Sequence, residues 1–167
     1  MSDAIDFWFD FSSPYSYLAS EVIDDLAAKH GRKVRWRPIM LGAAFKASGL
    51  PFLISIPLKG DYSKHDFDRS ARFLGIPYTF PPKFPLPTLA AARGYYWLHG
   101  QDCGKAREFA HAIFRAYWVE GRDISELSIV LEAVDSLGID RDAFSAAIAT
   151  PEIKERVKQE TDAAIAK

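Results

Sequence analysis

The segment from Ile5 to Ser20 constrains the fold of this chain more than any other part of its sequence. Apolar residues stand at every second position of its first half, which predicts a β-strand over residues 5–11 with one strongly apolar face. The strand runs into two serines, and Ser13 and Pro14 are the residue types preferred at a helix N-cap and at the first helical position. We therefore expect a helix to start here. Its free N–H groups and the positive end of its dipole would lie beside the Ser13 hydroxyl, a place suited to an anion such as a thiolate.

The tetrapeptide Ser13-Pro14-Tyr15-Ser16 has the spacing of the Cys-Pro-x-Cys redox motif, with hydroxyls in place of both sulfurs. A strand, this tetrapeptide and a helix suggest the thioredoxin superfamily without its disulfide chemistry. Two hydroxyls cannot carry two electrons. The use left for such a site is to hold and activate the thiol of another molecule.

The stretch F-D-F-S-S-P-Y-S-Y-L-A-S resembles the start of the 2-hydroxychromene-2-carboxylate isomerases, which are close to the kappa-class glutathione transferases and share the DsbA-like fold. In that family the serine before the proline activates glutathione. The resemblance implies that Ser13 is both the catalytic and the glutathione-binding residue. The alternative is a plain cap, because Ser-Pro is common at helix starts. We expect Ser12 and Ser16 to be structural.

The chain has 167 residues, of which 49% are hydrophobic and 14% aromatic, and this composition is that of a globular protein. Twenty-one basic and 22 acidic residues give a net charge of −1, so nothing in the charge balance points to nucleic acid or to an anionic membrane. A single cysteine, the absence of a basic N-terminal region and the lack of a long apolar run lead us to expect a cytoplasmic protein. The four histidines show no metal-ligand spacing, so no metal is expected.

A second strand is expected over residues 33–39, parallel to the first. From residue 40 to 60, glycines and prolines favour loops or short helices. Within this part, L-G-A-A-F-K-A-S-G resembles the family segment in which a lysine contacts the substrate carboxylate. The resemblance implies this role for Lys46, and the alternative is an ordinary solubilising charge.

Residues 61–74 read as a helix closed by Gly75, and residues 76–87 as an extended connector, because five prolines exclude a helix or a central strand there. The connector's G-I-P-Y-T-F-P-P-K-F-P resembles the family segment that forms a wall of the substrate pocket. Phe84 is the residue that this resemblance places against the substrate. A purely structural role in packing is the alternative.

Four amphipathic helices are predicted over residues 88–99, 104–120, 126–137 and 141–149, with Thr88, a 123–126 capping box and Asp140 as start signals. A further helix is expected from residue 150 to 167, with Thr150 as its capping residue and Pro151 at its first position. The predicted fold is α/β, a thioredoxin-like domain of DsbA type with an inserted all-helical subdomain. Residues 1–60 would form the first half of the thioredoxin-like domain, 61–149 the inserted subdomain, and 150–167 the returning helix.

In the family, that last helix leads into further strands that complete the sheet. We expect these C-terminal strands to be absent from this chain, which would leave the strand at residues 5–11 with an open edge.

The resemblance implies a glutathione-dependent isomerase of 2-hydroxychromene-2-carboxylate in aromatic hydrocarbon catabolism, with a small aromatic carboxylate as substrate. It also implies a homodimer. A kappa-like glutathione transferase and a non-catalytic fragment that depends on a partner are the alternatives.

Overall fold

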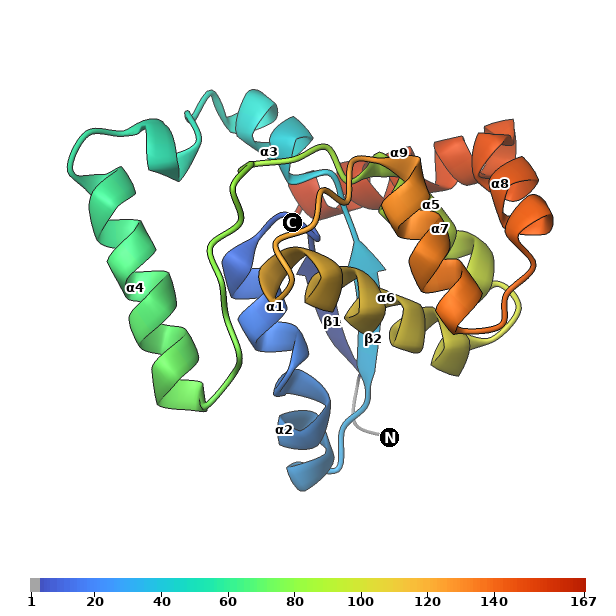
Figure 1. The fold of residues 1–167 in the computed structure, drawn as a ribbon, viewed down its shortest axis with the longest axis horizontal. Coiled ribbons are helices and arrows are strands. Elements are labelled where there is room, and N and C mark those ends of the chain that lie inside the picture. Colours follow the sequence, from blue (N-terminus) through green and yellow to red (C-terminus); the bar gives the residue numbers. More distant parts are fainter. Residues whose placement is uncertain (1–3) are drawn as a thin grey trace.

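The computed structural model describes residues 4–167, which form a mostly helical molecule around a small parallel sheet (Figure 1). The elements in chain order are β1 (Ile5–Phe9), α1 (Pro14–Ser20), α2 (Ile23–Lys29), β2 (Val34–Pro38), α3 (Leu41–Ser48), the 3-10 helix η1 (Leu53–Ser55), α4 (Lys59–Leu74), α5 (Leu89–His99), α6 (Cys103–Trp118), α7 (Leu127–Ser136), α8 (Arg141–Ala149) and α9 (Pro151–Ile165). In the described part of the chain, no helix is both long enough and apolar enough to cross a membrane.

The two strands pair in parallel, as predicted, with Ile5 opposite Val34 and Phe9 opposite Pro38. β1 ends at Phe9, two residues before the expected end, because the Asp10 carbonyl accepts a hydrogen bond from the Ser13 N–H and closes a turn. Phe11 is nevertheless fully buried. The apolar alternation of this segment therefore predicts the core side correctly even beyond the strand.

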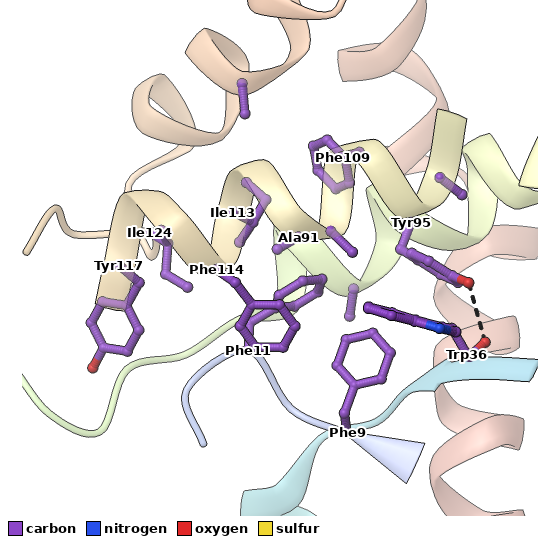
Figure 2. Packing of buried hydrophobic residues seen from close by; sticks show 14 of the residues in the cluster. Phe9, Phe11, Trp36, Ala91, Tyr95, Phe109, Ile113, Phe114, Tyr117 and Ile124 are labelled. Atoms are coloured by element: carbon purple, nitrogen blue, oxygen red, sulfur yellow. Dashed lines mark hydrogen bonds between the residues drawn. The ribbon is translucent and has the colours of Figure 1, made fainter. Parts of the chain in front are cut away.

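One hydrophobic core joins the sheet to α5 and α6. The Phe9 ring lies 6.0 Å from that of Tyr95 on α5 and 5.6 Å from that of Phe114 on α6, so both helices cover the apolar face of β1 (Figure 2). The Tyr95 hydroxyl also donates to the carbonyl of Trp36 in β2 at 3.3 Å. The predicted helices of residues 88–149 are all present and share this core, and the division of the chain at residues 60 and 149 stays a prediction.

The helix expected from residue 14 to about 30 is interrupted, so that prediction was wrong in this detail. α1 ends at Ser20, whose hydroxyl donates to the Tyr17 carbonyl at 2.7 Å. Serine side chains that bond the preceding turn compete with the backbone ladder of a helix. The chain makes a turn at residues 21–22, and α2 follows beyond it (Figure 1).

β1 pairs with β2 on one edge only within residues 4–167. Hydrogen bonds from Ile5 N–H to the Lys33 carbonyl and from Ile39 N–H to the Phe9 carbonyl show that alternate residues of β1 face β2. The backbone groups of Asp6 and Trp8 consequently point to the other edge, where no strand lies in the described part of the chain.

α4 stands at one side of the molecule, away from α7 and α8, and packs against α1 and η1 (Figure 1). Gly75 ends it in the left-handed conformation, as expected from the sequence. The connector that follows contains neither helix nor strand and returns along the molecule to α5. It thus links the outlying α4 to the core helices.

Candidate active site

Ser13 is the N-cap of α1. Its backbone is extended, with φ −92° and ψ 120°, and its Oγ accepts a hydrogen bond from the Ser16 N–H at 3.3 Å. Within residues 4–167 this is the hydroxyl's one side-chain hydrogen bond, and in it the oxygen is the acceptor. The proton of the Ser13 hydroxyl is therefore uncommitted and can be donated to a bound molecule.

Ser16, at the other hydroxyl position of the tetrapeptide, faces the backbone. Its Oγ lies 3.4 Å from the Asp10 N–H as an acceptor. Ser16 is not among the residues that line the cavity described next. The two hydroxyls of the motif thus occupy different surroundings.

Ser13 lines a cavity of about 390 Å³ between α1, α3, η1, α4 and the proline-rich connector. Its polar lining groups are gathered on the segment from Asp10 to Tyr15. The other walls are apolar, and four of them carry a phenylalanine, namely Phe45, Phe52, Phe67 and Phe84. The cavity therefore has one polar end and walls suited to a flat apolar molecule.

Phe84 lines the same cavity as Ser13, so the structure brings together two of the three residues that the sequence singled out. Its ring also packs edge-on against Trp118 at 5.7 Å and against Phe80 at 5.2 Å. The peptide bond between Phe84 and Pro85 is cis. Phe84 is thus held by its neighbours while one side of it borders the cavity.

Lys46 is exposed on α3 and does not line the cavity. It lies one helical turn after Gly42 and directly after Phe45, both of which do. In the described part of the chain it forms no ion pair. Its position is beside the cavity wall rather than inside it.

Asp10 is a cavity residue that sequence reasoning missed, because it read only as a polar position of the strand. It is 4% exposed and accepts four hydrogen bonds, from Ser12 N–H, Ser12 Oγ, Leu41 N–H and Thr88 Oγ1. Burial raises the pKa of this carboxyl, and the four donors act in the opposite direction. An acidic residue at the end of a strongly apolar strand was the signal that could have identified it.

Tyr15 joins α1 to α4 at the rim of the cavity. Its hydroxyl donates to Asp66 at 2.7 Å, and its ring packs edge-on against Phe67 at 4.6 Å. Burial and the neighbouring Asp66 raise the pKa of Tyr15, so the hydroxyl stays protonated at neutral pH. Tyr15 therefore holds the α4 wall of the cavity in place.

Metal chemistry has no visible basis in the described residues, where no cluster of three or more histidine, cysteine or acidic side chains could hold an ion. The chemical resources of the cavity are a hydroxyl with a free proton, a buried carboxylate and aromatic walls. The donor hydroxyl can hold an anionic atom, and the aromatic walls can hold a planar apolar group beside it.

Comparison with known sequences identifies close relatives. A DSBA-like thioredoxin domain matches residues 4–167. The 2-hydroxychromene-2-carboxylate isomerase of Pseudomonas putida is 33% identical over 165 residues, covering 96% of this chain and 78% of the relative. Glutathione S-transferase kappa 1 of Caenorhabditis elegans is 32% identical over 141 residues, covering 81% of this chain and 62% of the relative.

Solved structures agree with these relatives. A 2-hydroxychromene-2-carboxylate isomerase matches with a TM-score of 0.86 at 32% identity, covering 98% of this chain and 80% of that one. The cytosolic disulfide reductase DsbM from Pseudomonas aeruginosa with GSH shares the fold, with a TM-score of 0.67 at 18% identity over 96% of this chain and 79% of that one. The resemblance drawn from residues 9–20 is confirmed. The chain belongs to the 2-hydroxychromene-2-carboxylate isomerase family, within the DSBA-like thioredoxin domains.

Proposed function

We propose that this protein is a glutathione-dependent isomerase that acts on 2-hydroxychromene-2-carboxylate or a similar small aromatic carboxylate in aromatic hydrocarbon catabolism. The observation that carries the proposal is the Ser13 hydroxyl, whose uncommitted proton stands at the polar end of an otherwise apolar cavity. The relatives named as isomerases and as glutathione transferases support it.

Glutathione, when bound, would supply a thiolate that adds reversibly to the substrate and so permits rotation about a carbon–carbon bond. The Ser13 hydroxyl fits this group because it can donate its proton to a sulfur and so favour the charged form. Ser13 has no base among its hydrogen-bond partners in residues 4–167, so its role is donation rather than nucleophilic attack.

The aromatic walls would hold the substrate ring and exclude water from the reacting atoms. Phe84 is fixed by Trp118 and Phe80, so it can present a rigid surface to that ring. Lys46 would pair with the substrate carboxylate at the mouth of the cavity. This fits its exposed position beside Gly42 and Phe45 and its lack of an ion-pair partner in the described part of the chain.

The test is Ser13→Ala, assayed by the change in absorbance as the substrate isomerises with glutathione present. Loss of the donated hydrogen bond should lower turnover by at least about tenfold, which corresponds to about 1.4 kcal/mol of barrier. Ser16→Ala is the matched control, since its hydroxyl faces the backbone and should matter much less. Equal losses of turnover in the two variants would contradict the role proposed for Ser13.

A kappa-like glutathione transferase is the second candidate, favoured by the 32% identity to a kappa-class relative. Such an enzyme would join glutathione permanently to an electrophile, whereas an isomerase returns it. Measuring free thiol before and after complete turnover separates the two, because only the transferase consumes it.

A non-catalytic fragment that depends on a partner is the third candidate, and the unpaired edge of β1 favours it. We propose that a further strand covers this edge, either from a longer form of the polypeptide or from another chain.

We also propose a cytoplasmic homodimer. Sedimentation velocity at several concentrations tests the assembly, and a monomer at all of them would contradict the homodimer.

A further inference from the structure

Asp10 gathers three separate parts of the chain at the polar end of the cavity. Its Oδ1 accepts from Ser12 N–H at 2.8 Å, from Ser12 Oγ at 3.0 Å and from Thr88 Oγ1 at 2.9 Å, and its Oδ2 accepts from Leu41 N–H at 2.8 Å. Ser12 immediately precedes Ser13, Leu41 begins α3, and Thr88 directly follows the connector. One carboxylate thus holds the turn that carries Ser13 and the ends of two cavity walls.

These bonds suit an ionised carboxylate. Both oxygens accept from a backbone N–H, a group that can only donate. An asparagine at this position would turn its own NH2 toward one of them, so it cannot reproduce the set. The N-terminus of α3 also favours a negative charge.

No lysine, arginine or histidine of the described residues pairs with Asp10. The basic residues of the two helices whose starts meet it are Lys46 on α3 and Arg93 and His99 on α5. On α6, burial raises the pKa of the Tyr117 hydroxyl, and the charges of Asp123 and then Asp10 act in the same direction. Hydrogen-bond donors therefore stabilise the charge of Asp10, and removing one donor should make the carboxylate easier to protonate.

We propose that Asp10 is the positioning residue of this site, and that its ionised carboxylate keeps the Ser13 turn, the start of α3 and the connector in their working arrangement. The inference rests on the proposed isomerase function for its kinetic consequence. It adds a pH dependence, because protonation of Asp10 would release the donors that its charge holds. Burial raises the pKa of Asp10, so this loss should begin at a higher pH than for an ordinary aspartate.

The kinetic test compares Thr88→Val with Thr88→Ser, since Thr88 does not line the cavity and serine keeps the donor hydroxyl. Removing the donor destabilises the ionised form, so the acidic limb of the kcat profile should move to higher pH in Thr88→Val. It should stay in place in Thr88→Ser. Asp10→Asn should lose roughly tenfold or more in kcat at neutral pH, with the acidic limb gone. An unmoved acidic limb in Thr88→Val would overturn the proposal.

A second measurement does not depend on activity. In a pH titration followed by NMR, the Asp10 carboxyl carbon and the amides of Ser12, Ser13 and Leu41 should move with one common midpoint. That midpoint should rise in Thr88→Val and not in Thr88→Ser. Amides that titrate independently of Asp10 would contradict the positioning role. A common midpoint in a protein that isomerises nothing would instead reject the proposed function and leave the positioning role intact.

Discussion

Arg37 ties the outer face of the sheet to the last helix. Its Nε donates to Asp6 and its Nη1 to Glu160 of α9, each at 2.7 Å. Glu160 is 6% exposed and also pairs with Arg156 at 2.6 Å. The hydrogen bond with Arg37 lowers the pKa of Asp6, although burial opposes the effect. Arg37 therefore stabilises the fold rather than forming part of the active site.

Replacing Arg37 tests this assignment. Because the pKa of Asp6 is lowered on folding, its contribution to stability is present above the unfolded value of about 4 and is lost as the pH falls through the folded value. Arg37→Gln should lower the free energy of unfolding at neutral pH by roughly 1–3 kcal/mol, because a buried carboxylate loses a partner. The free energy of unfolding should also fall less steeply toward acidic pH in this variant, because Asp6 has lost the partner that lowers its pKa. Urea unfolding across this pH range measures both effects.

Arg35→Gln is the control for this prediction. Arg35 also pairs with Asp6, at 2.9 Å, but its side chain is 56% exposed. Exposed pairs contribute about 0–1 kcal/mol. A loss in Arg35→Gln as large as that in Arg37→Gln would mean that the bond to Glu160 adds nothing.

Among the elements, α5 and α8 pack closely because α5 carries a glycine at their contact. A Cβ on Gly94 would lie 2.5 Å from Cε2 of Phe144 and 3.1 Å from Cζ of Phe109. Both rings are fully buried and cannot move aside freely. The absent side chain is what allows the two helices to approach.

Gly94→Ala should consequently destabilise the protein by about 1–3 kcal/mol through overpacking, even though alanine is the better helix former by about 1 kcal/mol. Gly42→Ala in α3 is the matched change, since its new Cβ would meet only Phe52, at 3.9 Å. We expect that variant to be as stable as the parent or slightly more so. Thermal unfolding compares the two, and a stabilised Gly94→Ala would contradict the packing argument.

Helix positions were predictable from the sequence, but some side chains that were predicted to cap a helix form hydrogen bonds with other groups instead. Thr88 was expected to cap α5 and makes no side-chain cap bond, because its hydroxyl is engaged by Asp10. Residue 123 was expected to open α7, yet its carboxylate pairs with Lys83 of the connector and accepts from Ser125, and α7 starts at Leu127. Asp140 and Thr150 cap α8 and α9 as expected. A polar side chain serves as a cap only where no stronger tertiary partner competes for it.

Across the whole molecule, the family resemblance placed Ser13 and Phe84 at one site, because the short segments that carry it can be recognised locally in the sequence. It could not reveal which groups Asp10 binds, because its partners Leu41 and Thr88 lie 31 and 78 residues away. Nor could periodicity reveal the apolar walls from α3 and η1, which follow from how those short elements fold back over the β1–α1 turn. Long-range polar contacts leave no periodic trace in a sequence.

The unpaired edge of β1 leads to a prediction about the whole assembly. Backbone protons of Phe7 and Phe9 face β2, so they should exchange slowly with deuterated water, whereas those of Asp6 and Trp8 should exchange quickly in the chain alone. Two neighbouring residues of one strand would thus differ in isotope uptake, which NMR resolves residue by residue. Equal protection at all four positions would mean that the edge is already covered in solution.

Because of this unpaired edge, isotope uptake by the amides of β1 can show whether another strand has paired with it. Any strand that pairs there, from a longer polypeptide or from another chain, must take hydrogen bonds from Asp6 and Trp8 and therefore slow their isotope uptake, while Phe7 and Phe9 stay as they were. Adding candidate segments one at a time to a deuterium-labelled sample would then show which of them the sheet accepts, with no assay of catalysis.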